Sequence, residues 1–89
     1  MLRVTVEDLG TALSLKVEGR LAGVWVPELE QSWRMLVARS PGVGLIVDLT
    51  HTDFVDLAGK YLLSLMYQSG VQFRANSPYM KTLVDEIAG

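Results

Sequence analysis

The feature that most constrains the fold of this chain is the apolar segment of residues 43–49, with the sequence VGLIVDL. A nearly unbroken apolar run of strand length is typical of a strand that is buried on both faces, and such strands occur mainly in parallel sheets. Parallel strands need crossover connections, usually helices, so this segment predicts an α/β fold with a central strand. The 89 residues of the chain form a single domain with a small core.

An antiparallel hairpin is predicted before this segment. Apolar and polar residues alternate over residues 2–7 and again over residues 13–18, which is the pattern of half-buried strands. The short turn at residues 9–11 joins them as a hairpin. Gly19 is expected to end the second strand, and residues 19–27 are expected to be a loop.

Three segments have helical spacing of their apolar residues: 27–39, 57–69 and 78–87, with a short strand at 71–75 before the last. The buried stripe of the first should contain Leu29, Trp33, Leu36 and Val37. That of the third should contain Tyr79 or Met80, Leu83, Val84 and Ile87. Asp56 and Ser77 are the expected N-caps of the second and third helices. The element order ββαβαβα predicts an α/β sheet with right-handed crossovers.

Composition excludes several classes of function. The chain has no cysteine, which excludes disulfides, Cys-ligated zinc and iron–sulfur clusters. Its eight basic residues are scattered, which argues against nucleic-acid binding. The glycines fit no phosphate-binding motif, so we expect no cofactor. No signal peptide and no apolar run of membrane-spanning length is visible, which predicts a cytoplasmic domain without direct membrane insertion.

One polar segment, residues 48–56 with the sequence DLTHTDFVD, lies where the central strand leads toward a helix. Most of it is predicted to be a loop, at the place where open α/β sheets bind ligands. Asp48, Asp53 and Asp56 are side chains of the type that binds Mg²⁺, and His51 is of the type that transfers protons. The structural interpretation is favoured, with Asp56 as a cap, Asp53 in a turn and Asp48 accepting nearby N–H groups. We therefore expect no enzyme, with metal-dependent chemistry as a minor alternative.

The predicted helix at residues 57–69 has more apolar side chains than one face can hold. The face expected to be buried carries Ala58, Leu62, Leu65 and Met66. The surplus apolar residues are Leu57, Tyr61, Leu63 and Tyr67. A helix that is apolar over most of its circumference is either covered by more protein or docks a partner, and we favour the partner.

The element order, the Gly19-Arg20-Leu21 segment and the run LIVDLTHTDFVDLAG at residues 45–59 resemble the STAS domain, the fold of bacterial anti-sigma factor antagonists and of cytoplasmic domains of sulfate transporters. The family pattern is an apolar strand ending in Asp or Asn-Leu-Ser/Thr, then an aromatic or apolar pair and Asp-Ser-Ser/Ala-Gly at a helix start. Residues 70–87 also resemble the strand, Ser-Pro loop and helix that follow in the family. The resemblance covers essentially the whole chain and implies a small mixed sheet with helices mainly on one face.

The resemblance also implies roles for individual residues. In antagonists of this family, the anti-sigma factor is often a kinase that phosphorylates the Ser after the motif Asp, and phosphorylation breaks the complex. Here that position is Leu57, so the resemblance implies partner binding without this switch. Thr50, Thr52 and Ser64 are other hydroxyls that could accept a phosphate, but a structural role is favoured for each.

Two further positions carry over from the family pattern beside the cap Asp56. Asp48 matches the acid at the end of the central strand, and Gly59 matches a position of close packing. Many family members continue with one more strand and a final helix, so the chain is expected to lack these elements. An uncovered sheet edge or apolar face would then favour a partner or self-association.

The sequence therefore predicts a non-enzymatic interaction module of the antagonist type, which regulates transcription or signalling by binding an anti-sigma factor or kinase-like protein. The expected partner surface contains Thr50, Thr52, Asp53, Asp56, Leu57, Lys60 and Tyr61. One alternative is a cytoplasmic STAS subunit of a lipid-transport ABC complex, which needs no phosphoserine. Another is a homodimer formed through the apolar helix.

Overall fold

The computed structural model describes residues 1–89 and contains four strands and three helices. The strands are β1 (Leu2–Asp8), β2 (Leu13–Leu21), β3 (Leu45–Val55) and β4 (Gln72–Arg74), and the helices are α1 (Trp25–Arg39), α2 (Leu57–Gln68) and α3 (Pro78–Ala88). The predicted element order ββαβαβα is confirmed.

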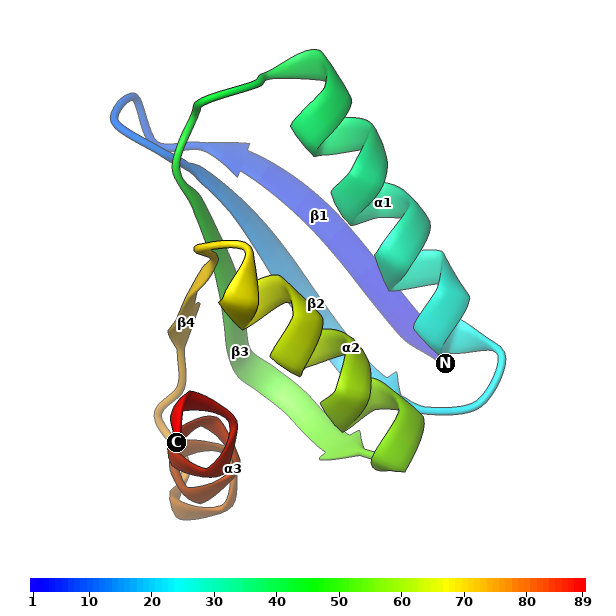
Figure 1. Ribbon diagram of the computed structural model, residues 1–89. Coiled ribbons are helices and arrows are strands. Elements are labelled where there is room, and N and C mark those ends of the chain that lie inside the picture. Colours follow the sequence, from blue (N-terminus) through cyan, green and yellow to red (C-terminus); the bar gives the residue numbers. More distant parts are fainter.

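The strands form one mixed sheet in the order β1-β2-β3-β4 (Figure 1). β1 and β2 are the predicted antiparallel hairpin, whereas β2 with β3 and β3 with β4 are parallel. β3 is therefore an internal strand with parallel neighbours, as its apolar run predicted. The α/β class and the mixed sheet are confirmed.

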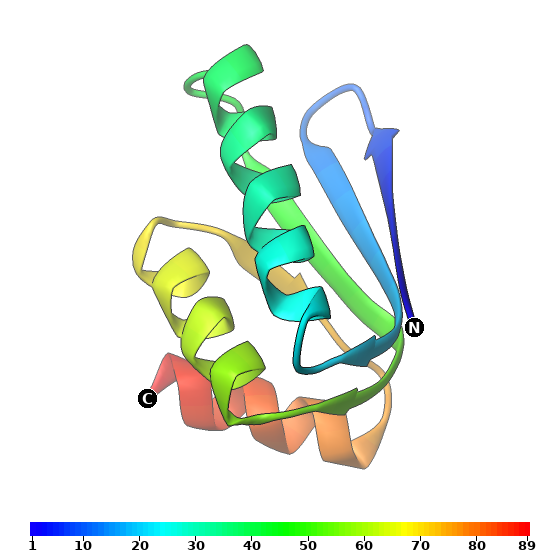
Figure 2. The same cartoon turned by 90° about the vertical axis from the view of Figure 1, so that its right-hand side faces the viewer.

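α1 and α2 pack on one face of this sheet and leave the other face open, and α3 lies beside α2 on the β4 side (Figure 2). The core lies between the sheet and the helices and contains 15 buried apolar side chains: Leu15, Val17, Leu21, Val26, Leu29, Trp33, Val47, Leu49, Val55, Leu62, Leu63, Met66, Val71, Met80 and Leu83. The prediction that β3 is buried on both faces is wrong. Val47 and Leu49 are fully buried toward the helices, but Ile46 and Asp48, which point to the open face, are only half-buried.

β2 continues two residues beyond the Gly19 that was expected to end it. Gly19 has a φ of +102°, and the Met1 carbonyl occupies the place where its Cβ would be, so only glycine fits here. The Arg20 N–H then donates to the Met1 carbonyl at 3.1 Å, which keeps the strand paired. Gly19 therefore allows β2 to continue, and the prediction that it ends this strand is wrong.

β3 is also longer than predicted, because residues 50–55 are strand and not loop. Two register shifts along β2 let this polar segment stay parallel to it, with Thr52 opposite Gly19 and Val55 opposite Leu21. The Thr52 hydroxyl is buried and donates to the Val17 carbonyl at 2.8 Å. A polar residue can thus lie inside the sheet because its hydrogen bond is made there.

The buried faces of α1 and α2 differ in part from those predicted. α1 begins at Trp25, so Val26 joins Leu29 and Trp33 in the core, while Val37 is 44% exposed. α3 turns Met80 inward and leaves Tyr79 outside, which selects one of the two predicted registers.

In α2, Leu63 is fully buried and Ala58 is exposed, the reverse of the prediction. α3 packs against α2, and Lys60, three residues before Leu63, lies 3.8 Å from Glu86 of α3. The buried face of α2 therefore differs from the one that helical periodicity alone suggested, in a helix that is contacted by both the sheet and α3.

Candidate functional site

The candidate site is the start of α2, where the chain leaves β3 and enters the helix. Asp56 is the N-cap, with extended backbone, and its Oδ1 accepts a hydrogen bond from the Gly59 N–H at 2.7 Å. Its Oδ2 accepts from the Gly23 N–H at 2.9 Å, in the loop before α1. One carboxylate thus fixes two segments that are far apart in the sequence.

These two hydrogen bonds stabilise the ionised form of the Asp56 carboxyl. The backbone N–H of Gly23, followed by that of Gly59, holds the pKa of the Asp56 carboxyl below its ordinary value. The group is therefore an anion at neutral pH, as a helix N-terminus favours. The bond to Gly23 had no signal in the local sequence, because its partner lies 33 residues away.

Gly59 brings the first turn of α2 close to the end of β2. A Cβ at this position would lie 2.7 Å from the Leu21 carbonyl oxygen and 2.8 Å from Cγ1 of Val55. The absent side chain lets the helix backbone approach the strand, which supports the predicted close-packing role. The start of α2 is therefore held from both sides, by a carboxylate and by packed backbone.

The outer side of this first turn is apolar and faces solvent. Leu57 is 82% exposed and Tyr61, one turn later, is 68% exposed. A shallow hollow lies on this side, and it is lined by Leu57, Ala58, Lys60, Tyr61 and Ser64. The predicted surplus of apolar residues on α2 is thus real at Leu57, Tyr61 and Tyr67, and not at Leu63.

The remaining predicted surface residues divide into two groups. Asp53 is exposed on β3, three residues before the cap Asp56, and Lys60 is partly exposed in the first turn of α2, where it lines the hollow. Thr50 lies five strand residues before Val55, roughly 17 Å along an extended strand. Thr52 is buried with its hydroxyl bonded, so its prediction as a partner-contact residue is corrected, while the structural role favoured over phosphorylation agrees with this hydrogen bond.

Asp48 forms a separate, local arrangement on the open face of the sheet. Its Oδ1 accepts from the Thr50 N–H at 2.9 Å, as expected for this carboxylate. Partial burial acts to raise the pKa of Asp48, but hydrogen bonding from Thr50 and the charge of Arg74 hold the pKa below its ordinary value. The Thr50 hydroxyl and Nδ1 of His51 lie 3.1 Å apart.

The minor alternative of a metal site does not fit this geometry. No group of three or more His, Asp or Glu side chains is placed to hold a metal ion. Asp48, Asp53 and Asp56 therefore do not converge. Asp53 also belongs to β3 and not to a turn, which corrects the earlier interpretation.

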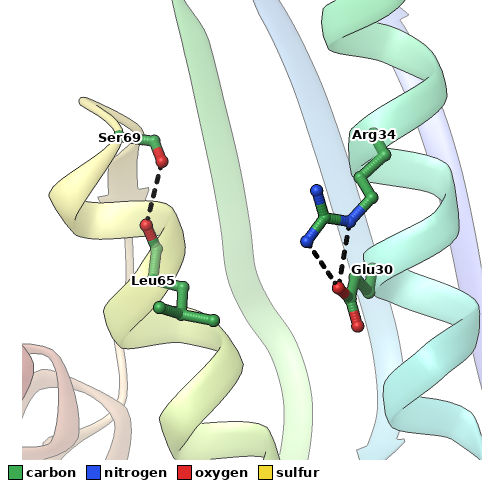
Figure 3. A network of polar contacts seen from close by, with 4 residues as sticks. All are labelled: Glu30, Arg34, Leu65 and Ser69. Carbon is green, nitrogen blue, oxygen red and sulfur yellow. Dashed lines mark hydrogen bonds and ion pairs between the residues drawn. The ribbon is translucent and has the colours of Figure 1, made fainter.

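A second hollow, with a volume of about 670 Å³, lies between the C-terminal half of α1, the segment of residues 40–45 and the turn of residues 69–71 that follows α2. Figure 3 shows two of its lining residues, Arg34 on α1 and Ser69 in the turn after α2. The Arg34 guanidinium is bound to Glu30 at 2.8 and 3.0 Å, and the Ser69 hydroxyl donates to the Leu65 carbonyl at 3.1 Å. The side chains of Arg34 and Ser69 are thus both engaged in hydrogen bonds within their own segments of the chain.

Comparison with known proteins agrees with this architecture. No family model and no curated protein matches the chain in sequence. Among solved structures, an anti-sigma factor antagonist from Mycobacterium paratuberculosis matches with a TM-score of 0.85 and 26% sequence identity, over 99% of this chain and 79% of the other. This chain has the anti-sigma factor antagonist fold.

A more distant structure shows the same fold. An uncharacterized protein with a SpoIIAA-like fold from Shewanella loihica matches with a TM-score of 0.56 and 18% identity, over 89% of this chain and 71% of the other. The STAS resemblance that the sequence motifs indicated is therefore confirmed as a structural match. In addition, none of the helices has the length and apolar character needed to span a bilayer.

Proposed function

We propose that this STAS-like chain is a non-enzymatic binding module that regulates transcription by binding an anti-sigma factor, which in some systems is a kinase-like protein. The match to a solved anti-sigma factor antagonist over 99% of the chain supports this class of function. The observation that carries the proposal is the exposed apolar surface at the start of α2, formed by Leu57, Ala58 and Tyr61.

This surface has the properties of a binding site and not of an accidental exposure. Leu57 is 82% exposed at the first position of a helix that is fixed by the two hydrogen bonds of Asp56. A rigid apolar surface loses little conformational entropy when it binds, so more of the contact free energy becomes affinity. Polar side chains lie beside it, since Lys60 and Ser64 line the same hollow, and a polar rim is usual for a protein interface.

The proposed interaction lacks a phosphorylation switch at the first position of α2. Leucine has no hydroxyl group that could accept a phosphate, and its side chain adds apolar area where a phosphate would add negative charge. Binding through this surface is therefore independent of phosphorylation at residue 57. Ser64 is the acceptor hydroxyl that lines the hollow.

The test is calorimetric titration of this chain with each anti-sigma factor of its own host. Leu57→Asp is expected to weaken binding at least about 30-fold, because a charge replaces a central apolar contact. The matched control is Met35→Asp on α1, which is 49% exposed and lies outside the hollow. Unchanged affinity of the Leu57→Asp variant, or an equal loss of affinity in the Met35→Asp variant, would contradict the proposed surface. Capture of an ABC-transporter subunit in place of an anti-sigma factor would replace the proposal.

A further inference from the structure

β1 is an edge strand of the sheet, so the backbone N–H and C=O groups on its outer side have no neighbouring strand. β1 has seven residues, pairs with β2 without a register shift, and contains neither Pro nor Lys. The opposite edge of the sheet, β4, has only three residues. Proteins usually protect sheet edges with short strands, bulges, Pro or Lys, and β1 has none of these devices.

The direction of the free backbone groups of β1 follows from its hydrogen bonds to β2. The Arg20 N–H donates to the Met1 carbonyl at 3.1 Å, and the Leu9 N–H donates to the Ala12 carbonyl at 2.9 Å. In an antiparallel pair, every second residue directs its N–H and C=O toward the neighbouring strand. The odd-numbered residues of β1 therefore bond to β2. The even-numbered ones present N–H and C=O groups outward: Leu2, Val4, Val6 and Asp8.

We propose that two copies of this chain pair antiparallel through β1, with Thr5 opposite the partner's Thr5. In this register Val4 lies opposite the partner's Val6, and both use their outward N–H and C=O groups. Arg3 lies opposite the partner's Glu7, and by symmetry Glu7 lies opposite the partner's Arg3. These charged residues fall in the non-hydrogen-bonded pairs, where opposing side chains approach most closely.

The charges of Arg3 and Glu7 favour a second copy of this chain as the partner of β1, and they favour one register of pairing. Arg3 and Glu7 are exposed, and neither takes part in the two ion pairs of the structure, Glu30–Arg34 and Lys60–Glu86. A shift by two residues in either direction places Arg3 or Glu7 opposite Thr5 and leaves the charges unmatched. A second copy of the same strand is therefore complementary to β1 in one register only.

The pairing also accounts for the apolar side of β1. Val6 is 51% exposed, although Val4 on the same face packs against the core. Side by side with the partner's Val4, each Val6 gains an apolar neighbour across the joined sheet. The apolar surface of α2 takes no part in this pairing, so each copy keeps it free for its own partner.

The test is sedimentation equilibrium of the full chain at micromolar to submillimolar concentrations. Arg3→Glu and Glu7→Arg are each expected to raise the dissociation constant of the dimer about tenfold, because each places two like-charged pairs across the interface. An equimolar mixture of the two variants is expected to form heterodimers as tightly as the unchanged chain forms homodimers. The double variant Arg3→Glu/Glu7→Arg is expected to recover the homodimer.

A second variant separates pairing from folding. Val6→Pro removes an N–H that points outward, so it should abolish the dimer and leave the circular dichroism spectrum unchanged. Thr5→Pro removes an N–H bonded to β2, so it should also lower the melting temperature. A chain that is monomeric over the whole concentration range would overturn the proposal, as would a dimer that is insensitive to Val6→Pro and to the charge reversals.

Discussion

The helices α1 and α2 pack on the same face of the sheet but are held in different ways. α1 has no side-chain cap, since its N-cap position is Val24, and it is anchored along its length by Val26, Leu29 and Trp33. α2 also buries side chains along its length, but its first turn is fixed in addition, where Asp56 caps the helix and Gly59 brings it against β2.

Because of this difference, we expect α1 to contribute mainly to the stability of the fold and the outer side of α2 to contribute to partner binding. The inner side of α1 supplies core, and its N-cap position is occupied by the exposed Val24, which makes no capping hydrogen bond. In α2 the backbone and the cap fix the first turn, so the side chain of Leu57 is free to face solvent. Changes in the core side of α1 should therefore act on unfolding, and changes at the outer side of α2 should act on binding alone.

The largest expected effect comes from the anchor of α1. Leu29→Ala should lower the free energy of unfolding by about 2–5 kcal/mol, because a fully buried side chain is removed and a cavity remains. Chemical denaturation measures this change. Met35→Ala on the same helix, at a half-exposed position, is the control and should change it by less than about 0.5 kcal/mol. Similar losses in both variants would show that α1 is not anchored by its buried face.

A smaller effect is expected at the anchor of α2. Gly59→Ala should cost about 1–3 kcal/mol, since the new methyl group meets the Leu21 carbonyl and the Val55 side chain. Gly44→Ala is the matched control, because its Cβ would meet nothing closer than the Ala12 Cβ at 4.0 Å. A neutral Gly59→Ala would show that the helix can move away from β2 without loss.

The smallest effect concerns the charge of the Asp56 cap. Its folded-state pKa is lowered, so the unfolded chain binds more protons in acid and stability falls as the pH decreases. This contribution is complete above the unfolded pKa of about 3.9 and is lost as the pH falls through the folded pKa. Asp56→Asn keeps a capping oxygen and removes the titration. Urea denaturation between pH 7 and pH 3 should therefore show a flatter profile for Asp56→Asn, and parallel profiles would contradict this assignment.

The parts of the fold that sequence predicted were those with local causes. The alternation in the hairpin, the capping residues Asp56 and Ser77, and the apolar run of β3 each leave a pattern within a few residues. The resemblance added the family fold and pointed to the start of α2. Whether the surface there binds a partner remains a prediction.

The features that sequence missed depend on contacts between distant segments. The extension of β3 requires two register shifts and the bond of Thr52 to Val17, neither of which a period of two can show. The bond from Gly23 to Asp56 and the burial of Leu63 against the α3 side are equally remote in sequence. In each case a contact between distant segments determined the local structure, and no pattern within a few residues indicates such a contact.

The open face of the sheet has a consequence for how such chains diverge. Since the helices cover only one face of the sheet, strand residues that are exposed on the other face can be exchanged for other polar side chains with little effect on the packing of the core. Sequences can thus drift far while the backbone stays in place. The match to the antagonist from Mycobacterium paratuberculosis, with 26% identity at a TM-score of 0.85, agrees with this expectation.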